Sequence, residues 1–319
     1  MNLRQMRYFV AVYEEGGFGR AATREHCTQS GISQQIRQLE ERLGATLFER
    51  NPHGVEATLA GREYYQRCVP VLHAARAADQ HIVELRGQLS GTVRAGLIPT
   101  LTKGALASVL VSFTAAHPHV DIHITEAYSQ PLTDQVVAGA LDFAIVPVLP
   151  PRHVPGLSVR VLATEEEMLL SGPKLGLQNM VPLPVRELGR CKLVLPSPEN
   201  SRRPFLEGQF ERAGVAAERI MSMDGMTGTF EFIAASDWAT ILPVTACIGE
   251  VSGKRLRVSP LIEPSIPFDF ILIEPARQPL SSPARAFVDA IEAELDSVAA
   301  AWRRTRSRHG RKAPPGACA

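Results

Sequence analysis

The distribution of apolar residues over the first sixty positions predicts three consecutive helices. The stretch from Leu3 to Tyr13 is apolar at helical spacing and closes at Gly16-Gly17, and residues 18–25 form a second short segment. In the third segment, four apolar residues recur at steps of four, three and four and form one stripe: Ile32, Ile36, Leu39 and Leu43. Thr28 is a suitable N-cap and Gly44 a suitable stop, so this helix is about four turns long.

The third helix has a second, polar face that suits contact with DNA. Hydroxyl, amide and guanidinium groups gather on it: Gln29, Ser30, Ser33, Gln34 and Arg37. Such groups can approach base edges and phosphates in a major groove. The pattern therefore predicts a helix-turn-helix with this helix as its reading helix. The alternative is a small packing module in which Arg37 is only a solvated surface charge.

The residues after the reading helix predict a two-stranded wing. Pro and Gly separate short apolar runs between residues 47 and 57, and Arg50 would lie beside a phosphate. Residues 1–60 contain seven Arg and seven acidic residues, so this unit is itself neutral. DNA affinity must then come from individual contacts in an oligomer and not from bulk charge.

Residues 58–90 predict a long helix with a heptad seam. Its members follow alternating steps of four and three: Tyr64, Cys68, Val71, Ala75, Ala78, Ile82, Leu85 and Leu89. A helix of about 30 residues is some 45 Å long, which is too long for the seam to be buried on the small N-terminal unit alone. The seam predicts a partner helix and hence a homo-oligomer. The alternative is an amphipathic connector that lies on its own chain. In either case Pro70 interrupts the hydrogen-bond ladder, which can kink the helix.

After residue 90, alternating strands and helices predict a parallel-rich α/β domain with two lobes. We expect first-lobe strands over 92–97, 121–127 and 143–148, and helices over 103–116 and 132–140. Segments 157–163 and 167–170 cross to a second lobe with strands over 192–195, 220–223, 239–242 and 256–258 and helices over 203–213 and 228–235. A return strand over 268–273 and a closing helix over 283–301 complete the first lobe.

The predicted division of the chain follows from these segments. It consists of a DNA-binding domain (1–58), a linker helix (59–89), a two-lobed domain (90–302) and a tail (303–319). The first lobe covers about 90–162 and 268–302, and the second about 163–267.

Ligands of open α/β sheets bind beyond the carboxyl ends of the strands, where helix N-termini favour anions. The candidate positions in the first lobe are Thr100, Thr102, Ser129, Gln130 and Pro147, and those in the second lobe are Ser197, Asn200, Arg202, Thr227 and Thr229. Hydroxyls and backbone N–H groups with one guanidinium suit a small carboxylate or another anionic effector. Each hydroxyl could instead be an ordinary helix cap.

Composition adds several expectations. The 319 residues carry a net charge of +1, and six basic residues lie in the tail without an acid after Asp296: Arg303, Arg304, Arg306, Arg308, Arg311 and Lys312. We expect this tail to be disordered, with nonspecific DNA contact as the alternative. The sequence shows no secretory signal and no apolar run of about 20 residues, which predicts a cytoplasmic protein without membrane contact.

Five scattered cysteines lack CxxC or His-paired spacing, which argues against a zinc site and against a disulfide framework. The sequence accordingly predicts neither a metal nor a cofactor. A redox pair of Cys191 and Cys247 is the alternative to buried thiols.

Several short motifs together resemble the N-terminal domain of LysR-type transcriptional regulators. They are Leu3-Arg4-Gln5-Met6-Arg7-Tyr8-Phe9, Ala21-Ala22, Leu39-Glu40, Leu43-Gly44, Leu47-Phe48-Glu49-Arg50 and Thr58-x-x-Gly61. The resemblance implies a multidomain protein with a winged helix-turn-helix, a long linker helix and a two-lobed α/β domain similar to type 2 periplasmic binding proteins. It also implies effector contacts in strand-to-helix turns, which favours Thr100, Thr102, Ser129 and Thr227. The chain departs from the family pattern at Gly17, Gly19, Glu25 and Gln34, and Gln34 replaces a common basic residue of the reading face.

We therefore expect a transcriptional regulator whose partners are double-stranded DNA, a small effector, a second copy of the chain and RNA polymerase. An α/β enzyme with a helical assembly domain is the alternative, but the sequence contains no G-x-S-x-G, Gly-rich phosphate loop or HExxH motif. A transport binding protein would leave the reading helix unexplained. The sequence leaves open the effector, the operator, activation or repression, and dimer or tetramer.

Overall fold

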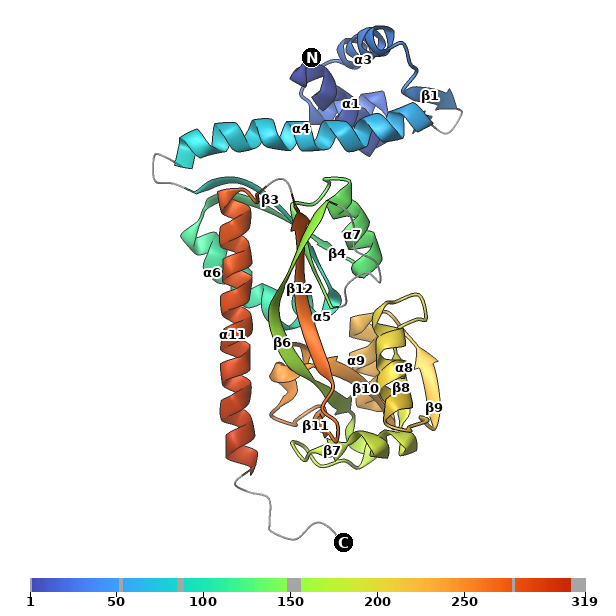
Figure 1. Ribbon diagram of the computed structural model, residues 1–319, viewed down its shortest axis with the longest axis vertical. Helices are drawn as coiled ribbons and strands as arrows, with labels where there is room; N and C mark the ends of the chain where they lie inside the picture. Colours follow the sequence, from blue (N-terminus) through green and yellow to red (C-terminus); the bar gives the residue numbers. More distant parts are fainter. Residues whose placement is uncertain (1, 52–53, 85–88, 148–155, 277–278, 311–319) are drawn as a thin grey trace. The chain divides into compact units, whose positions relative to one another are not determined.

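The computed structural model describes residues 2–51, 54–84, 89–147, 156–276 and 279–310 (Figure 1). The chain forms two compact units, one with residues 1–88 and 137–140 and the other with residues 89–136 and 141–319. Of the sequence predictions, Leu85, the end of the strand over 143–148, and the tail residues Arg311 and Lys312 lie outside the described residues.

The first unit is a winged helix-turn-helix followed by a long helix. Its elements are α1 (Leu3–Glu15), α2 (Phe18–Arg24), α3 (Gln29–Leu43), β1 (Phe48–Asn51), β2 (Gly54–Ala57) and α4 (Leu59–Glu84). The two glycine stops are confirmed, because Gly16 and Gly44 end their helices at φ +60° and +65°, a region that favours glycine. The wing is confirmed as well, since β1 and β2 pair antiparallel.

The apolar stripe of α3 is correct except at its last member. Ile32, Ile36 and Leu39 are fully buried, whereas the Leu43 side chain is 42% exposed. Leu43 is the last helical residue, and the left-handed Gly44 turns the chain away from the core directly after it. Only the first three residues of the stripe therefore pack into the core of the unit.

The first half of α4 belongs to the core of the first unit. Tyr65, Cys68 and Leu72 are buried there among residues of α1 and the wing. The helix continues through Pro70. The side chains of Ala78 and Ile82 lie outside the described part, so the partner helix remains a prediction.

The second unit contains two sets of parallel strands joined by long antiparallel ones. In the first lobe, β3 (Ser90–Leu97) pairs parallel with β4 (His119–Glu126) and β5 (Phe143–Val146). In the second lobe, β8 (Lys192–Leu195) pairs parallel with β9 (Arg219–Ser222) and β10 (Trp238–Pro243). Strands β6 (Leu157–Ser171) and β12 (Pro267–Pro275) run side by side between the lobes, and Figure 1 shows them as the central ribbons of this unit.

Helices cover both lobes. The first lobe carries α5 (Pro99–Leu101), α6 (Ala107–Ala116), α7 (Ser129–Val137) and α11 (Ser282–Gly310), and the second carries α8 (Arg202–Arg212), α9 (Met226–Ala235) and α10 (Val244–Cys247). The small strands β7 (Leu183–Pro184) and β11 (Arg257–Ile262) and three 3₁₀ turns (Pro173–Leu175, Val185–Arg190, Ile248–Glu250) complete the second lobe. The α/β pattern is therefore confirmed, with a mixed sheet.

The ends of several segments are shifted by a few residues, as for the helix expected over 132–140, which is α7, and two predicted segments were wrong in detail. The two crossing strands are one continuous strand, β6, because β12 pairs with its first half and β10 and β11 with its second half. The helix expected over 103–116 contains a π-helical turn over Thr102–Leu106. This turn brings Gly104 against the backbone of Thr245, where a Cβ atom would lie 2.1 Å from the carbonyl oxygen.

The closing helix is longer than predicted, and residues 303–310 are not a disordered tail. Helix α11 continues to Gly310, and its last turns have partners in the rest of the unit. Val298 and Trp302 are buried in the second-lobe core, and Arg306 pairs with Glu166 of β6 at 3.0 Å. The helix therefore joins the first lobe to the second.

Gly61 provides a stability test of the first unit. A Cβ atom at this position would lie 2.2 Å from the carbonyl oxygen of Leu47, so Gly61→Ala forces the start of α4 away from the wing. We expect a loss of about 1–3 kcal/mol, as for other overpacked sites. Gly208→Ala in α8 is the control, because no described atom lies within 4 Å of its Cβ position, and it should stabilise by about 0.5–1 kcal/mol. Thermal unfolding of the full chain compares the two, and equal melting temperatures would contradict the contact.

Candidate functional site

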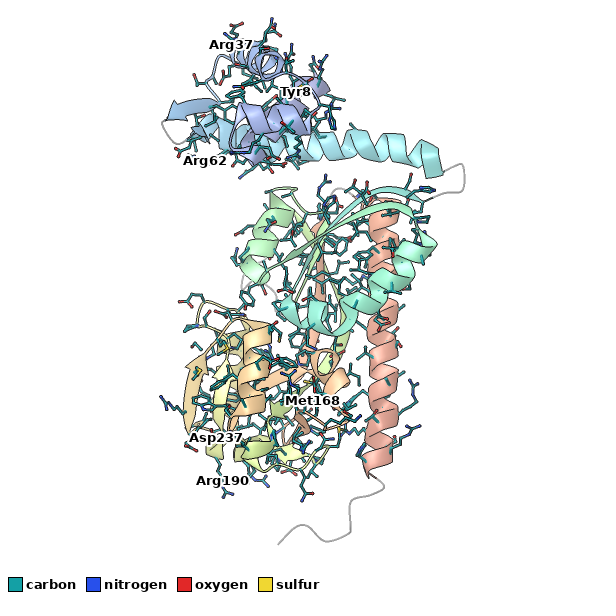
Figure 2. The ribbon with its side chains drawn as sticks, turned by 180° about the vertical axis from the view of Figure 1, so that it is seen from behind. Tyr8, Arg37, Arg62, Met168, Arg190 and Asp237 are labelled. Carbon is teal, nitrogen blue, oxygen red and sulfur yellow. The ribbon has the colours of Figure 1, made fainter. Side chains whose placement is uncertain are left out.

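The polar face of α3 is exposed as predicted. The side chain of Thr28 accepts the N–H of Gly31 at 3.2 Å and caps the helix. Gln29, Ser30, Gln34 and Arg37 are exposed, while Ser33 is half-buried. Figure 2 shows Arg37 on α3 among the outward side chains of this unit. The start of α3 therefore presents donors and acceptors to an external partner.

A groove beside α3 collects most of the predicted DNA-binding residues. Its described lining consists of Phe18, Gln29, Ser30, Ser33, Ile36, Arg37, Glu40 and Phe48. Gln34 is not among these residues. The one carboxylate among these described lining residues is already bonded, because Glu40 accepts the N–H groups of Leu47 at 2.7 Å and of Phe48 at 3.2 Å. It holds the start of the wing, and these N–H groups stabilise its charge.

Two other positions complete the description of this face. The backbone of Arg50 pairs with Val55 in the wing, but its side chain lies outside the described part, so its phosphate contact remains a prediction. Glu25, which departs from the family pattern, forms an ion pair with Arg7 at 2.8 Å and so links α1 to the end of α2.

A cavity lies between the two lobes of the second unit, at the carboxyl ends of their parallel strands. It encloses about 570 Å³ of empty space, part of it open to solvent. The described lining from the first lobe is Ile98, Pro99, Thr100, Tyr128, Ser129 and Pro147, and Phe268 lies on β12. The second lobe contributes Val194, Leu195, Pro196, Asn200, Arg202, Met223, Asp224, Met226, Thr229, Thr240 and Leu242.

Six of the ten expected effector residues line this cavity. Thr100, Ser129, Pro147 and Arg202 line it, as do Asn200 and Thr229. Thr102, Gln130, Ser197 and Thr227 are not among the described lining residues. Three of these four make local bonds instead: the Thr102 hydroxyl with Glu126, the Gln130 amide with Asp134 at 2.8 Å, and the Ser197 N–H with Asp224 at 3.0 Å.

Hydrogen bonds join the two lobes beside the cavity. The Tyr128 hydroxyl donates to the backbone oxygen of Asp224, and the Ser201 hydroxyl donates to the Ser129 hydroxyl at 3.0 Å. Burial, followed by the nearby Asp224, raises the pKa of Tyr128 to about 12, so this phenol keeps its donor proton well into the alkaline range. These bonds therefore bridge the two lobes beside the cavity.

Thr100 is the unusual group of this cavity. Its side-chain oxygen is buried and has no hydrogen-bond partner among the described residues. Buried polar atoms are rarely left without a partner. A hydroxyl of this kind, at the N-terminal turn of α5, is suited to a bound polar group.

Arg202 is compensated inside the protein. Its Nη2 lies 2.6 and 2.8 Å from the two carboxylate oxygens of Glu167 and donates to the backbone oxygen of Ile241 at 2.7 Å. Glu167 is 0% exposed, so burial raises the pKa of this carboxyl, and the guanidinium partly offsets the rise. The guanidinium also lies 5.5 Å from the ring centre of Phe268. Arg202 thus links α8 to β6, and the Glu167 carboxylate largely neutralises its charge.

Sequence reasoning missed the apolar walls and the tyrosine of the cavity. It searched for polar residues in turns, whereas Met223, Met226 and Phe268 are apolar and lie outside such a search. The Asp224 carboxylate accepts the Ser197 N–H, and the residue also lines the cavity. Tyr128 could have been predicted, because it lies directly before the predicted Ser129 in the same strand-to-helix turn.

The two cysteines considered as a redox pair lie in the protein core. Cys191 and Cys247 are free and buried in different core clusters, and burial raises the pKa of both. Among the described residues no group of three or more His, Cys, Asp or Glu side chains is placed to hold a metal ion. Likewise, none of the described helices is both long enough and apolar enough to cross a bilayer.

A reading helix in one unit and a cavity between two α/β lobes in the other are the arrangement of a DNA-binding protein with a ligand domain. Comparison with known families gives two matches. Residues 3–62 match the bacterial regulatory helix-turn-helix proteins of the LysR family, and residues 86–296 match the LysR substrate binding domain.

Individual relatives agree with these matches. The chain is 27% identical to the transcriptional regulator TfdS of Cupriavidus pinatubonensis over 91% of this chain and 97% of that protein. It is 30% identical to the regulator CfxR of Cupriavidus necator over 66% and 65%. A cysteine-to-aspartate variant of full-length OxyR from Pseudomonas aeruginosa has the same fold, with a TM-score of 0.73 and 20% identity over 92% and 94% of the two chains.

The chain belongs to the LysR family. It is a DNA-binding transcriptional regulator with a substrate-binding domain, and it is not an enzyme.

The buried ion pair of the cavity predicts strong non-additivity. Arg202→Met leaves the Glu167 carboxylate buried without its cation, which costs about 3–5 kcal/mol in comparable pairs. Replacing both partners with Arg202→Met and Glu167→Gln removes the isolated charge, so the double variant should recover much of that loss. Urea unfolding of the two single variants and the double variant measures the coupling. Additive losses would show that the pair is not the compensated unit described above.

Proposed function

We propose that a small molecule in the interlobe cavity controls the DNA binding of this regulator. The observation that carries the proposal is the buried Thr100 hydroxyl, which has no partner among the described residues in a cavity closed by bonds between the lobes. A ligand acceptor or donor there would complete the hydrogen bonding that the protein leaves open. The apolar walls would bury the rest of the molecule.

We further propose that this effector carries an anionic group on an apolar body. Arg202 contributes little net positive charge to the cavity, because it is paired with Glu167. The argument for an anionic group therefore rests on the helix N-termini. Helices α7, α8 and α9 begin at Ser129, Arg202 and Met226, and all three residues line the cavity. N-terminal N–H groups stabilise anions. Asp224 also lines the cavity and favours an effector whose charge lies away from that side.

On the DNA side, we propose that Gln29, Ser30, Ser33, Gln34 and Arg37 read the major groove and that Arg50 contacts a phosphate. The exposed polar face of α3 and its groove support this assignment. We propose that α4 pairs with a second copy, so that two reading heads address half-sites on one DNA face. We also propose that the protein acts in the cytoplasm and contacts RNA polymerase.

The mechanism that we propose is a population shift. The effector favours one closure of the two lobes, and the linker helices respond by changing the separation of the reading heads. The chain would then act as three parts, 1–58, 59–89 and 90–302. Since α11 continues to Gly310, the effector domain in this proposal extends beyond residue 302.

Arg37 tests the reading face. Arg37→Ala removes an exposed guanidinium from the groove and should weaken binding to DNA from upstream of the protein's own gene by about tenfold or more. Arg42→Ala removes the same charge from the last turn of α3 and is not among the described groove residues, so it should have a small effect. A mobility-shift titration compares them. Equal weakening by both variants would mean that only net charge matters.

Thr100 tests the cavity. Thr100→Val keeps the shape and removes the unpartnered hydroxyl, so the free protein should be as stable as wild type or slightly more stable. The effector's stabilisation of the protein against heat should fall, with affinity about tenfold lower for a lost hydrogen bond of about 1.4 kcal/mol. A thermal-shift screen of small carboxylates on both proteins measures this. A hit that shifts both proteins equally does not use Thr100, and DNA affinity without effector should not change.

A further inference from the structure

The last turns of α11 carry exposed positive charge that the functions described above do not use. The helix continues to Gly310, and six basic residues but no acidic residue follow Asp296. Three of the basic residues, Arg303, Arg304 and Arg308, form what we call the basic end of α11, and all three are exposed. Their guanidinium groups form no ion pair or hydrogen bond with any of the described residues. Their charge is therefore available to an external partner.

The opposite side of the same turns is fixed to the protein. Trp302 is buried in the second-lobe core, and Arg306 pairs with Glu166 of β6 at 3.0 Å. Because an α-helix has 3.6 residues per turn, Arg304 and Arg308 lie on the side of α11 that faces away from Trp302. They are one turn apart, about 6 Å along the helix axis. The packed side therefore holds these two arginines in a fixed row on the exterior of the unit.

The composition of the basic end favours phosphate groups as its partner. All exposed residues over 303–309 are polar or charged. A protein interface is usually anchored by buried apolar or aromatic residues, and a helix that binds a membrane surface needs an apolar face. Five of the six basic residues after Asp296 are arginines, whose planar guanidinium matches a phosphate with two hydrogen bonds. These features suit a polymer of phosphates more than an acidic protein or a bilayer.

The charge distribution of the chain points to DNA as that polymer. Residues 1–60 contain seven Arg and seven acidic residues, so the reading unit has no excess of positive charge. The net charge of the whole chain is +1, so without the six basic residues after Asp296 the chain would be acidic and repelled by DNA. The sequence-independent part of DNA affinity comes from phosphates that basic side chains neutralise. The basic end of α11 is suited to supply this part.

We propose that the basic end of α11 binds backbone phosphates of the DNA duplex, outside the bases that α3 reads. Such contacts add affinity for any sequence and no preference between sequences. The proposal requires only the DNA binding that membership of the LysR family shows, and it does not require an effector.

The salt dependence of DNA binding by the full-length protein tests this proposal. Fluorescence anisotropy would measure affinity over a range of salt concentrations, on DNA from upstream of the protein's own gene and on an unrelated fragment of equal length. For Arg304→Gln with Arg308→Gln, the slope of log affinity against log salt should fall by at least about 1.8, or about 0.9 for each lost phosphate contact. Binding at about 0.1 M salt should weaken about tenfold, equally on both fragments. Arg304→Lys with Arg308→Lys keeps the charge and should keep a slope near that of wild type.

A matched control separates a phosphate contact from a change in net charge. Arg212→Gln with Lys174→Gln also removes two exposed positive charges, but from the second lobe, and should leave the slope unchanged. Thermal unfolding should be similar in all of these variants, because the side chains of the basic end lose no partner among the described residues.

Three results would overturn the proposal. An unchanged slope in the Arg304→Gln, Arg308→Gln variant would mean that α11 does not contact phosphates, and an equal change in the control would mean that only net charge matters. Weakening on the upstream fragment alone would indicate contact between protein copies assembled there. Arg37→Ala in the same assay should reduce the preference for the upstream fragment. The function proposed for the reading face can therefore hold while this proposal fails.

Discussion

The buried ion pair between Arg202 and Glu167 is the constraint on which the ligand domain depends. Glu167 lies on the strand that crosses between the lobes, and Arg202 begins a helix of the second lobe. A charged group at 0% exposure is stable only when it is paired, so the two elements must stay together. Arg202 also forms part of the cavity wall with Phe268. The same interaction thus fixes the second lobe on its crossing strand and removes most of the positive charge that the sequence offered to an effector.

The lobe contacts are of a different kind. Single hydroxyl bonds, Tyr128 to Asp224 and Ser201 to Ser129, join the lobes across the cavity. Such bonds contribute about 0.5–1.5 kcal/mol each, far less than breaking a buried charge pair. These bonds across the cavity are therefore weaker than the ion pair, and α11 joins the lobes as well through Val298 and Trp302 in the second-lobe core. In the first unit, rigidity comes instead from the aromatic core around Phe9, which supports the exposed face of α3.

Much of the fold could be predicted, because local signals in the sequence agree with the packing. Thr28, Gly16 and Gly44 define helix ends by local chemistry, and the predicted β8 agrees residue for residue with the structure. The π turn at Gly104, the continuous β6 and the length of α11 depend on contacts with distant residues such as Thr245 and Glu166, which no local pattern contains. Thr100, Ser129 and Arg202 could be placed at strand ends, but Glu167 as the partner of Arg202 could not. The apolar side of the cavity was missed, because apolar residues in a sequence do not distinguish a cavity wall from a core.

The most direct test of the central claim, that lobe closure controls DNA binding, needs no knowledge of the effector. The hydroxyls of Ser129 and Ser201 lie 3.0 Å apart across the lobes, so Ser129→Cys with Ser201→Cys should form a disulfide that locks the closed state. A mobility-shift titration on DNA from upstream of the protein's own gene would compare the oxidised and reduced double variant, with each single variant as a control. We predict a change in affinity of at least about fivefold on oxidation of the double variant alone. Equal affinities in the locked and unlocked protein would contradict the account.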